Sequence, residues 1–291
     1  MRKTYKLFIG GAFPRSESGR SYPVATPGGQ LLAYAARASR KDARDAVRAA
    51  RGAVARWSGA TAYNRGQVLY RVAEVMEGRA AQFAADVAAA EGITIQNAAA
   101  QAEAAIDRWV WYAGWTDKVA AVAGAANPVA GPYFNFSVPE PTGVVAILAP
   151  PASSLLGLVS VLAPVIATGN TAVVVTSRER PLPAITLAEV LATSDVPAGV
   201  VNLLTGDPAE LAPVLAAHQD VDAIDLTGAP PGSAADLEAL AAGNLKRVFR
   251  GRDDAPGLAP GSPEQDWLPG PGTARLLAFL EIKTVWHPAG I

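Results

Sequence analysis

The longest uncharged stretch of this chain sets the strongest limit on its fold. No charged residue occurs between Glu140 and Arg178, and more than half of that stretch is Val, Ile, Leu or Ala. Pro150 and Pro151 interrupt it, and its longest helical piece, residues 153–168, falls short of the roughly 20 residues that cross a bilayer. Parallel strands covered on both faces read as continuous apolar runs. We therefore predict a buried strand followed by a buried helix, and no membrane span.

From Gly143 onward the chain repeats a strand, a turn and a helix. The β-type runs are residues 144–149, 172–175, 200–204, 223–226 and 246–249. The helical stretches between them are residues 153–168, 183–192, 209–218 and 234–242. Ser233 and Asp236 resemble a capping box at the start of the last helix. This alternation predicts an α/β fold with a doubly wound parallel sheet, which commonly binds nucleotides at its strand carboxyl ends.

The region before this alternation reads as edge strands followed by helices. Residues 8–13 predict short edge strands or hairpins, and Ser39 with Asp42 resembles a capping box. Further helices are expected at residues 64–77, 80–90 and 96–118. The last carries four aromatic residues, which we interpret as packing core rather than a ligand platform: Trp109, Trp111, Tyr112 and Trp115.

The chain ends in two segments of different character. Ten of the 22 residues at 251–272 are Pro or Gly, which predicts a linker. Residues 273–291 look like a short helix that passes into a strand, and residues 133–138 alternate like a half-buried strand. We expect one cofactor-binding-type domain over residues 1–250, then this linker and the final helix and strand.

Composition excludes several classes of function. A formal net charge of -1 with 18% charged residues argues against a nucleic-acid or anionic-membrane partner. No cysteine is present, which excludes a disulfide, a thiolate metal site and a thiol nucleophile. Only His218 and His287 are available, so a histidine-rich metal site is also excluded. The first residues contain no apolar signal core, which predicts a cytoplasmic protein.

Short phrases along the chain resemble the aldehyde dehydrogenase family in order and spacing. They lie at residues 8–11, 112–115, 140–145, 167–171, 197–202, 220–222, 226–228, 244–248 and 281–286. The resemblance covers about residues 5–250 and again 273–291. It implies the Rossmann-like cofactor domain of that family with a small β oligomerisation arm and no catalytic domain.

The resemblance also implies that catalysis is lost. In this family a cysteine thiolate attacks the aldehyde, a glutamate acts as base and an asparagine holds the oxyanion. The asparagine position is Ala152 here, the glutamate position is Gly251, and the nucleophile's domain is missing. No residue is identified as a replacement. The acidic pairs 253–254 and 264/266 read as solvated surface, Ser153 and Ser154 as a helix cap, and neither histidine as a base.

The implied cofactor site is vestigial. Glu179, Gly206, Thr227 and Gly228 match family positions. The ribose-binding lysine aligns with Thr176, and two glycines of the phosphate turn align with Pro208 and Ala212, which deny close backbone approach. We therefore expect no cofactor, or only weak NAD(P) binding.

What survives of the family pattern points to assembly. Residues 133–138 and 282–286 match the two strands of the oligomerisation arm, and exposed strand edges favour association. The chain resembles the catalytically dead half of two-part aldehyde dehydrogenases. The leading hypothesis is a non-catalytic subunit that scaffolds or regulates a full-length aldehyde dehydrogenase paralogue, with a homodimer as the simpler variant. The alternatives are a weakly active NAD(P)-dependent oxidoreductase and a nucleotide-binding regulatory module.

Overall fold

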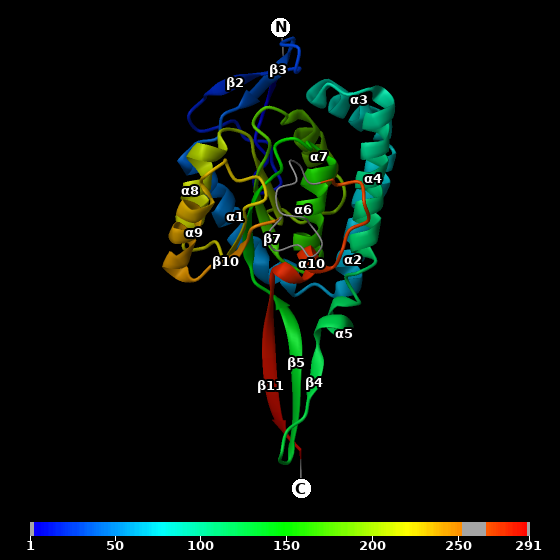
Figure 1. Ribbon diagram of the computed structural model, residues 1–291, viewed down its shortest axis with the longest axis vertical. Coiled ribbons are helices and arrows are strands. Elements are labelled where there is room, and N and C mark those ends of the chain that lie inside the picture. The colour runs from blue at the N-terminus through cyan, green and yellow to red at the C-terminus, as the bar shows by residue number, and fades with distance from the viewer. Residues whose placement is uncertain (1–2, 252–265, 290–291) are drawn as a thin grey trace.

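The computed structural model describes residues 3–251 and 266–289, and its strands form three separate sheets. Figure 1 shows a body of helices around a central sheet, from which a narrow arm projects and carries the C-terminal strand. The predicted linker, residues 251–272, lies for the most part outside the described residues, as do Asp253, Asp254 and Glu264 of the two acidic pairs.

The central sheet is five-stranded and entirely parallel, in the order β10-β9-β6-β7-β8. Its strands are β6 (Val144–Leu148), β7 (Thr171–Val175), β8 (Val201–Leu204), β9 (Ala223–Asp225) and β10 (Arg247–Phe249). Every residue of β6 and β7 is buried. Each predicted strand is present within one residue at either end, because short apolar runs bounded by turn residues favour buried strands over helices.

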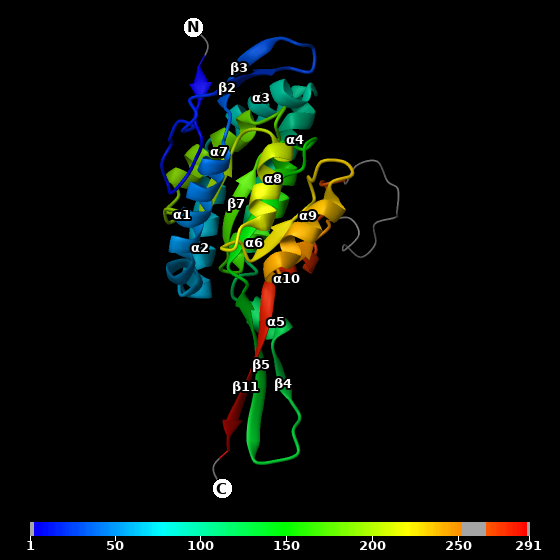
Figure 2. The same ribbon diagram turned by 90° about the vertical axis from the view of Figure 1, so that its left-hand side faces the viewer.

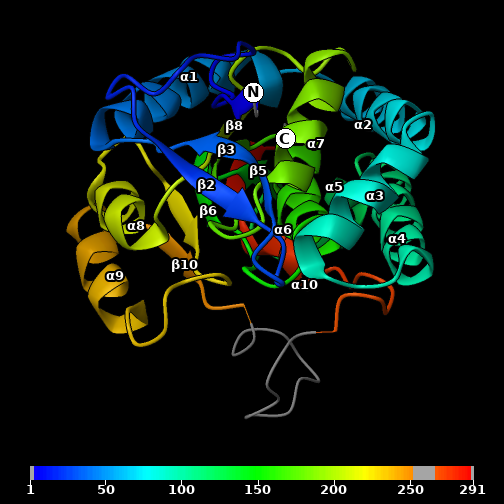
Figure 3. The same ribbon diagram turned by 90° about the horizontal axis from the view of Figure 1, so that it is seen from above.

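Helices cover both faces of this sheet, as a doubly wound fold requires (Figure 3). One face carries α1 (Arg40–Ser58), α8 (Pro208–Ala217), α9 (Ala234–Ala241) and the short 3₁₀ helix η1 (Ala242–Asn244). The other carries α6 (Leu156–Ala167) and α7 (Leu182–Ala192), with α2 (Ala62–Glu77), α3 (Ala80–Glu91) and α4 (Ile95–Ala113) outside them. The predicted α/β class and doubly wound topology are confirmed.

The uncharged segment folds as predicted into β6 and α6, and all residues of α6 are buried. Within residues 3–251 and 266–289, no helix has the length and apolar character to span a bilayer. The segment owes its composition to burial between the sheet and the outer helices.

Two helix-boundary predictions have different outcomes. The capping box at Ser39 and Asp42 is present, with both reciprocal hydrogen bonds. The one at Ser233 is wrong, because its hydroxyl donates to the Pro230 carbonyl oxygen at 2.7 Å and caps no helical N–H. Pro230 and Pro231 bend the chain into a turn that offers this nearer acceptor.

The helix predicted at residues 96–118 ends at Ala113, and the separate helix α5 (Val119–Ala123) follows. Thr116 donates its hydroxyl to the Ala113 carbonyl oxygen at 2.9 Å and competes with the helical ladder. Trp109 and Tyr112 are buried in the core, which confirms their predicted packing role. Trp111 and Trp115 are half-buried and pack against the same cluster.

The N-terminal sheet is β1 (Thr4–Tyr5), β3 (Leu31–Ala36) and β2 (Ser21–Ala25), in that order. The strands expected at residues 8–13 reduce to isolated bridges, in which Phe8 pairs with Leu203 of the edge strand β8. Gly10 and Gly11 adopt φ of 60° and 77°, which turns the chain back at once and leaves no room for a longer hairpin.

The arm is a three-stranded antiparallel sheet, in the order β11-β5-β4. Its strands are β4 (Ala125–Asn127), β5 (Tyr133–Pro141) and β11 (Leu280–Pro288). Both predicted arm strands are present, and Ile282–Trp286 pairs opposite Asn135–Pro139. The short helix α10 (Ala274–Ala278) immediately precedes β11 at the base of the arm, and Figure 2 shows the arm extending away from the body.

Candidate functional site

The carboxyl ends of the parallel strands define the candidate site. From β6, the chain adds β7 and β8 on one side and β9 and β10 on the other. The crevice outside β6 and β9 is therefore the topological switch point, where open α/β sheets bind their ligands. The turns after β6, β7, β8 and β9 contain most of the predicted site positions.

The turn after β6 holds Ala152, the residue that the family resemblance places at the oxyanion amide. Ala152 is half-buried and offers only a methyl group, and its carbonyl oxygen accepts from the Arg180 guanidinium. The predicted cap is wrong, because the N-cap residue of α6 is Leu155 and no side chain caps the helix there. Ser153 lies two residues earlier, and its hydroxyl accepts from the Gly157 N–H at 2.8 Å. The hydroxyl and backbone N–H of Ser154 both donate to Glu91 at 2.7 Å. The two serines are thus engaged in structural contacts.

The turn after β7 separates the two positions expected at a ribose. Thr176 is buried, and its hydroxyl donates to the Leu204 carbonyl oxygen at 3.4 Å. Glu179 follows in the turn beyond the buried end of β7 and is exposed to solvent. A cation that could assist a ribose hydroxyl is absent at residue 176, since threonine is uncharged.

The turn after β8 places a carboxylate where the fold would place a phosphate. Gly206 is buried, and the following Asp207 caps α8 by accepting from the Ala209 N–H at 3.1 Å. Asp207 also pairs with Arg178 at 2.6 Å. Pro208, the first residue of α8, has no N–H to offer. The positive end of this helix is therefore already neutralised by a side chain of the protein.

The turn after β9 is held by an internal ion pair. Asp225 is fully buried at the end of β9, and its Oδ2 accepts from Arg275 at 2.6 Å. The Thr227 N–H donates to the other carboxylate oxygen at 2.9 Å, and its hydroxyl accepts from Arg275 at 2.8 Å. A Cβ at Gly228 would lie 2.0 Å from the Ala149 carbonyl oxygen, so the backbones of the two turns touch.

Gly251, the residue that the resemblance places at the family's base, leaves no space for a side chain. Gly251 has φ of 71°, and a Cβ there would lie 2.7 Å from the Thr227 hydroxyl oxygen. Any larger residue would be strained at the backbone and would collide with the turn after β9. The next residues, beginning with Arg252, lie outside the described part of the chain.

The two histidines lie outside the turns that form the candidate site. His218 ends α8, where its Nδ1 accepts from the Asp220 N–H at 3.1 Å, and burial lowers the pKa of its ring. His287 lies on β11 in the arm. Within the described residues, no three His, Asp or Glu side chains gather in a way that could hold a metal ion.

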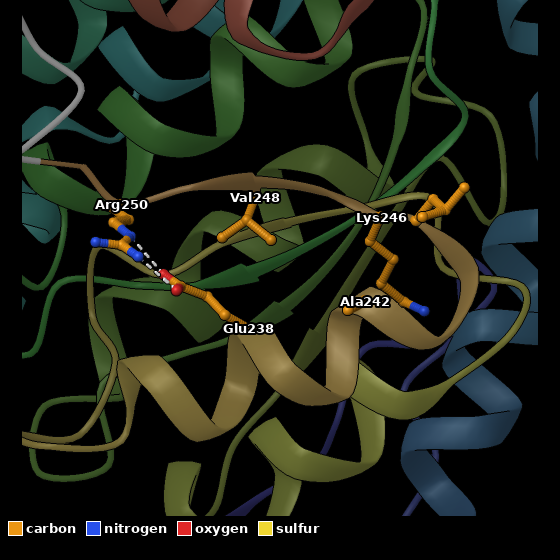
Figure 4. A pocket seen from close by; sticks show the side chains of 6 residues that line it. Glu238, Ala242, Lys246, Val248 and Arg250 are labelled. Carbon is orange, nitrogen blue, oxygen red and sulfur yellow. Dashed lines mark hydrogen bonds and ion pairs between the residues drawn. The ribbon is translucent and has the colours of Figure 1, made fainter.

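A shallow groove of about 450 Å³ lies elsewhere, between α9 and the edge strand β10 (Figure 4). Glu238 on α9 and Arg250 after β10 form an ion pair along it, and Val248 lines its floor. Because β9 separates β10 from β6, this groove is distinct from the switch point.

The sequence reasoning overlooked Asp225, Arg275 and Arg108, the three buried charged residues that organise this region. A signal was present for two of them. Asp225 interrupts an apolar strand, and Arg275 interrupts an apolar run, and charged residues are almost never buried unless paired. That the two form one pair depends on the fold, since β9 and α10 are far apart in sequence.

Comparison with known proteins accounts for this architecture. Residues 13–250 match the model of the Aldehyde dehydrogenase family. Retinal dehydrogenase 2 of Gallus gallus is 34% identical over 253 residues, which are 84% of this chain and 48% of that protein. Retinal dehydrogenase 2 of Homo sapiens is 32% identical over 253 residues, which are again 84% of this chain and 48% of that protein.

Solved structures of aldehyde dehydrogenases have the same fold over most of this chain. HpcC from Thermus thermophilus has a TM-score of 0.79 and 30% identity, over 86% of this chain and 49% of that one. The NAD+ complex of an aldehyde dehydrogenase from Bacillus cereus has a TM-score of 0.78 and 27% identity, over 84% and 50%. This chain spans about half the length of its relatives. The chain belongs to the aldehyde dehydrogenase family.

Proposed function

We propose that this protein is a non-catalytic member of its family that associates with a full-length aldehyde dehydrogenase through the arm, and scaffolds or regulates that partner. The observation that carries the proposal is the arm itself. Both strands that the resemblance predicted for the arm are present, paired in an antiparallel sheet that projects from the body. In contrast, the residues that the resemblance places at the oxyanion amide and the base are Ala152 and Gly251.

The arm offers apolar side chains on both of its faces. Residues that pair directly in an antiparallel sheet share a face. One face therefore carries Tyr133 and Trp286, whose rings lie 5.8 Å apart and which are 47% and 59% exposed. The other carries Phe134, which is 56% exposed, beside Phe136 and Val285. Exposed aromatic rings on a strand pair favour burial against a partner protein.

The arm is nevertheless rigid enough to present a defined surface. Asn127 donates to Asn135 at 2.6 Å and to Ser137 at 2.9 Å, and Ser137 bonds to Thr284 at 3.0 Å. This polar ladder joins all three strands and fixes their register, which a specific docking surface needs.

The residues that the resemblance places at the family's reactive positions support the proposal that the isolated chain does not catalyse aldehyde oxidation. The sequence contains no cysteine, Ala152 replaces the oxyanion amide, and Gly251 has no room for a carboxylate. A pyrophosphate would meet the Asp207 carboxylate at the start of α8 and a Thr227 hydroxyl already engaged by Arg275. These residues do not fit a dinucleotide, and we propose that NAD(P) binding is weak or absent. Glu179, Gly206, Thr227 and Gly228 would then be vestiges of a cofactor site.

The test is co-expression of the tagged chain with the full-length aldehyde dehydrogenase of the same cell. We expect a stable hetero-oligomer by light scattering, with aldehyde oxidation only when the full-length enzyme is present. Val285→Asp places a charge beside Phe136 on the arm and should abolish co-purification. The matched control is Val110→Asp, the same change at an exposed position of α4 in the body.

Two results would contradict the proposal. One is an isolated chain that is monomeric and oxidises aldehydes by itself. The other is a Val285→Asp variant that sediments and co-purifies like the unchanged protein. If the complex contained only copies of this chain, the homodimer would be supported and the hetero-oligomer would be rejected.

A further inference from the structure

Arg275 connects the C-terminal segment to the centre of the fold. It lies on α10, its side chain is 10% exposed, and it pairs with the fully buried Asp225. Together with the Thr227 N–H and hydroxyl, the guanidinium satisfies both carboxylate oxygens of Asp225. Removing one partner of such a buried ion pair is strongly destabilising, because the other partner is left as an uncompensated charge that water does not reach.

Aromatic rings enclose the same guanidinium. Its central carbon lies 4.7 Å from the ring centre of Phe249 and 5.3 Å from that of Trp267. Phe249 belongs to β10, and its ring meets that of Phe279 at 6.0 Å. The cation is thus held between the edge of the central sheet and the segment that carries it, where cation–π attraction adds to the ion pair.

A second buried arginine fixes the residues before α10. Arg108 on α4 is 6% exposed and donates to the carbonyl oxygens of Trp267 at 2.7 Å and Pro269 at 3.0 Å. Its third acceptor is the Ser160 hydroxyl on α6, at 2.8 Å. Among the described residues no carboxylate accepts from Arg108, so its charge depends on these neutral acceptors.

Apolar side chains complete the attachment. Leu276 and Phe279 are 1% exposed and belong to the main core cluster with α4 and α6. The Phe279 carbonyl oxygen accepts from the Thr142 N–H and from the Asn170 side chain, at 3.2 and 2.9 Å. One residue later β11 begins, so these contacts anchor the base of the arm.

We infer that residues 266–279 form an internal strap, which closes the α6–β10 side of the body without a catalytic domain and holds β11 in place, with Arg275 as its latch. Residues of the strap cover this side of the body whether or not a partner binds the arm. Because Arg275 and Phe279 contact residues of the body, the base of the arm is held by the central fold.

Hydrogen exchange of the full chain tests the latch. Arg275→Leu should accelerate exchange of the amides in α10 and the first half of β11 by about tenfold or more, because one side of a buried ion pair is lost. The β6 and β7 amides, protected in the central sheet, report that the fold persists. The matched control is Arg247→Leu, which removes an exposed ion pair to Glu281 on β11 and should change exchange by less than about threefold.

Arg275→Lys keeps the charge but loses the planar fork, and provides a milder variant if Arg275→Leu does not fold. We expect exchange of the same amides between that of the unchanged protein and that of the leucine variant. Exchange in α10 and β11 that matches the unchanged protein within about twofold in Arg275→Lys and in any folded Arg275→Leu would overturn the latch. So would acceleration by Arg247→Leu equal to that of the Arg275 variants.

Discussion

The Asp225–Arg275 pair should dominate the stability of the C-terminal segment. Asp225→Asn preserves the side-chain shape and the acceptor for the Thr227 N–H, but leaves the Arg275 cation uncompensated in a buried site. Breaking one side of such a pair costs about 3–5 kcal/mol. Replacing both partners removes the uncompensated charge, so Asp225→Asn with Arg275→Met should cost clearly less than the sum of the single changes.

Urea unfolding followed by circular dichroism measures these costs. With a slope of about 3 kcal/mol per molar urea, a loss of about 3 kcal/mol lowers the midpoint by about 1 M. Arg71→Met, which removes an ion pair whose side chains are 54% and 64% exposed, is the control and should cost less than about 1 kcal/mol. Single variants that each cost less than about 1 kcal/mol and add within about 0.5 kcal/mol would refute a coupled buried pair.

Three further outcomes are expected. Gly251→Ala should lower the free energy of unfolding more than Gly232→Ala. Both glycines have positive φ, which costs an alanine about 1–2 kcal/mol, but only at Gly251 would the methyl group meet Thr227. Equal losses of stability in urea unfolding would contradict this contact. Burial lowers the pKa of His218 in the folded state, so the unfolded chain binds more protons near the ordinary histidine pKa. Thermal stability should therefore fall as the pH drops from about 7.5 to 5.5, and His218→Gln should flatten that fall; an unchanged slope would assign it to other groups. Titration calorimetry with NAD+ or NADP+ should show no saturation below on the order of 1 mM, and a clear isotherm at micromolar ligand would show that Asp207 does not block the helix N-terminus.

The sequence predicted the central sheet well because its strands are decided locally. The runs that became β6 and β7 are apolar at nearly every position and only five residues long, and short runs bounded by turn residues favour a strand covered on both faces over a helix. The cap at Ser39 was equally local, since both partners lie within one helical turn. Both arm strands were also expected, although their pairing came from the family resemblance rather than from alternation alone.

The same reasoning failed where a side chain had a choice of partners. Ser233 has a capping sequence, but its hydroxyl turns to the nearer Pro230 carbonyl oxygen. Asp207 had no role in the sequence predictions, yet in the fold it caps the start of α8 and pairs with Arg178. Nothing in the local sequence ranks these competing hydrogen bonds, because their distances are set by how strands and helices meet.

Gly251 and Thr227, two of the positions that the family resemblance singles out, are in direct contact. Gly251 has no room because the Thr227 hydroxyl lies against it, and Thr227 is placed there by Asp225 and Arg275. A glutamate at residue 251 would therefore have to displace the turn that the latch holds. The contacts that place Thr227 against Gly251 also hold α10 at the base of the arm, so a larger residue at position 251 is expected to loosen the arm.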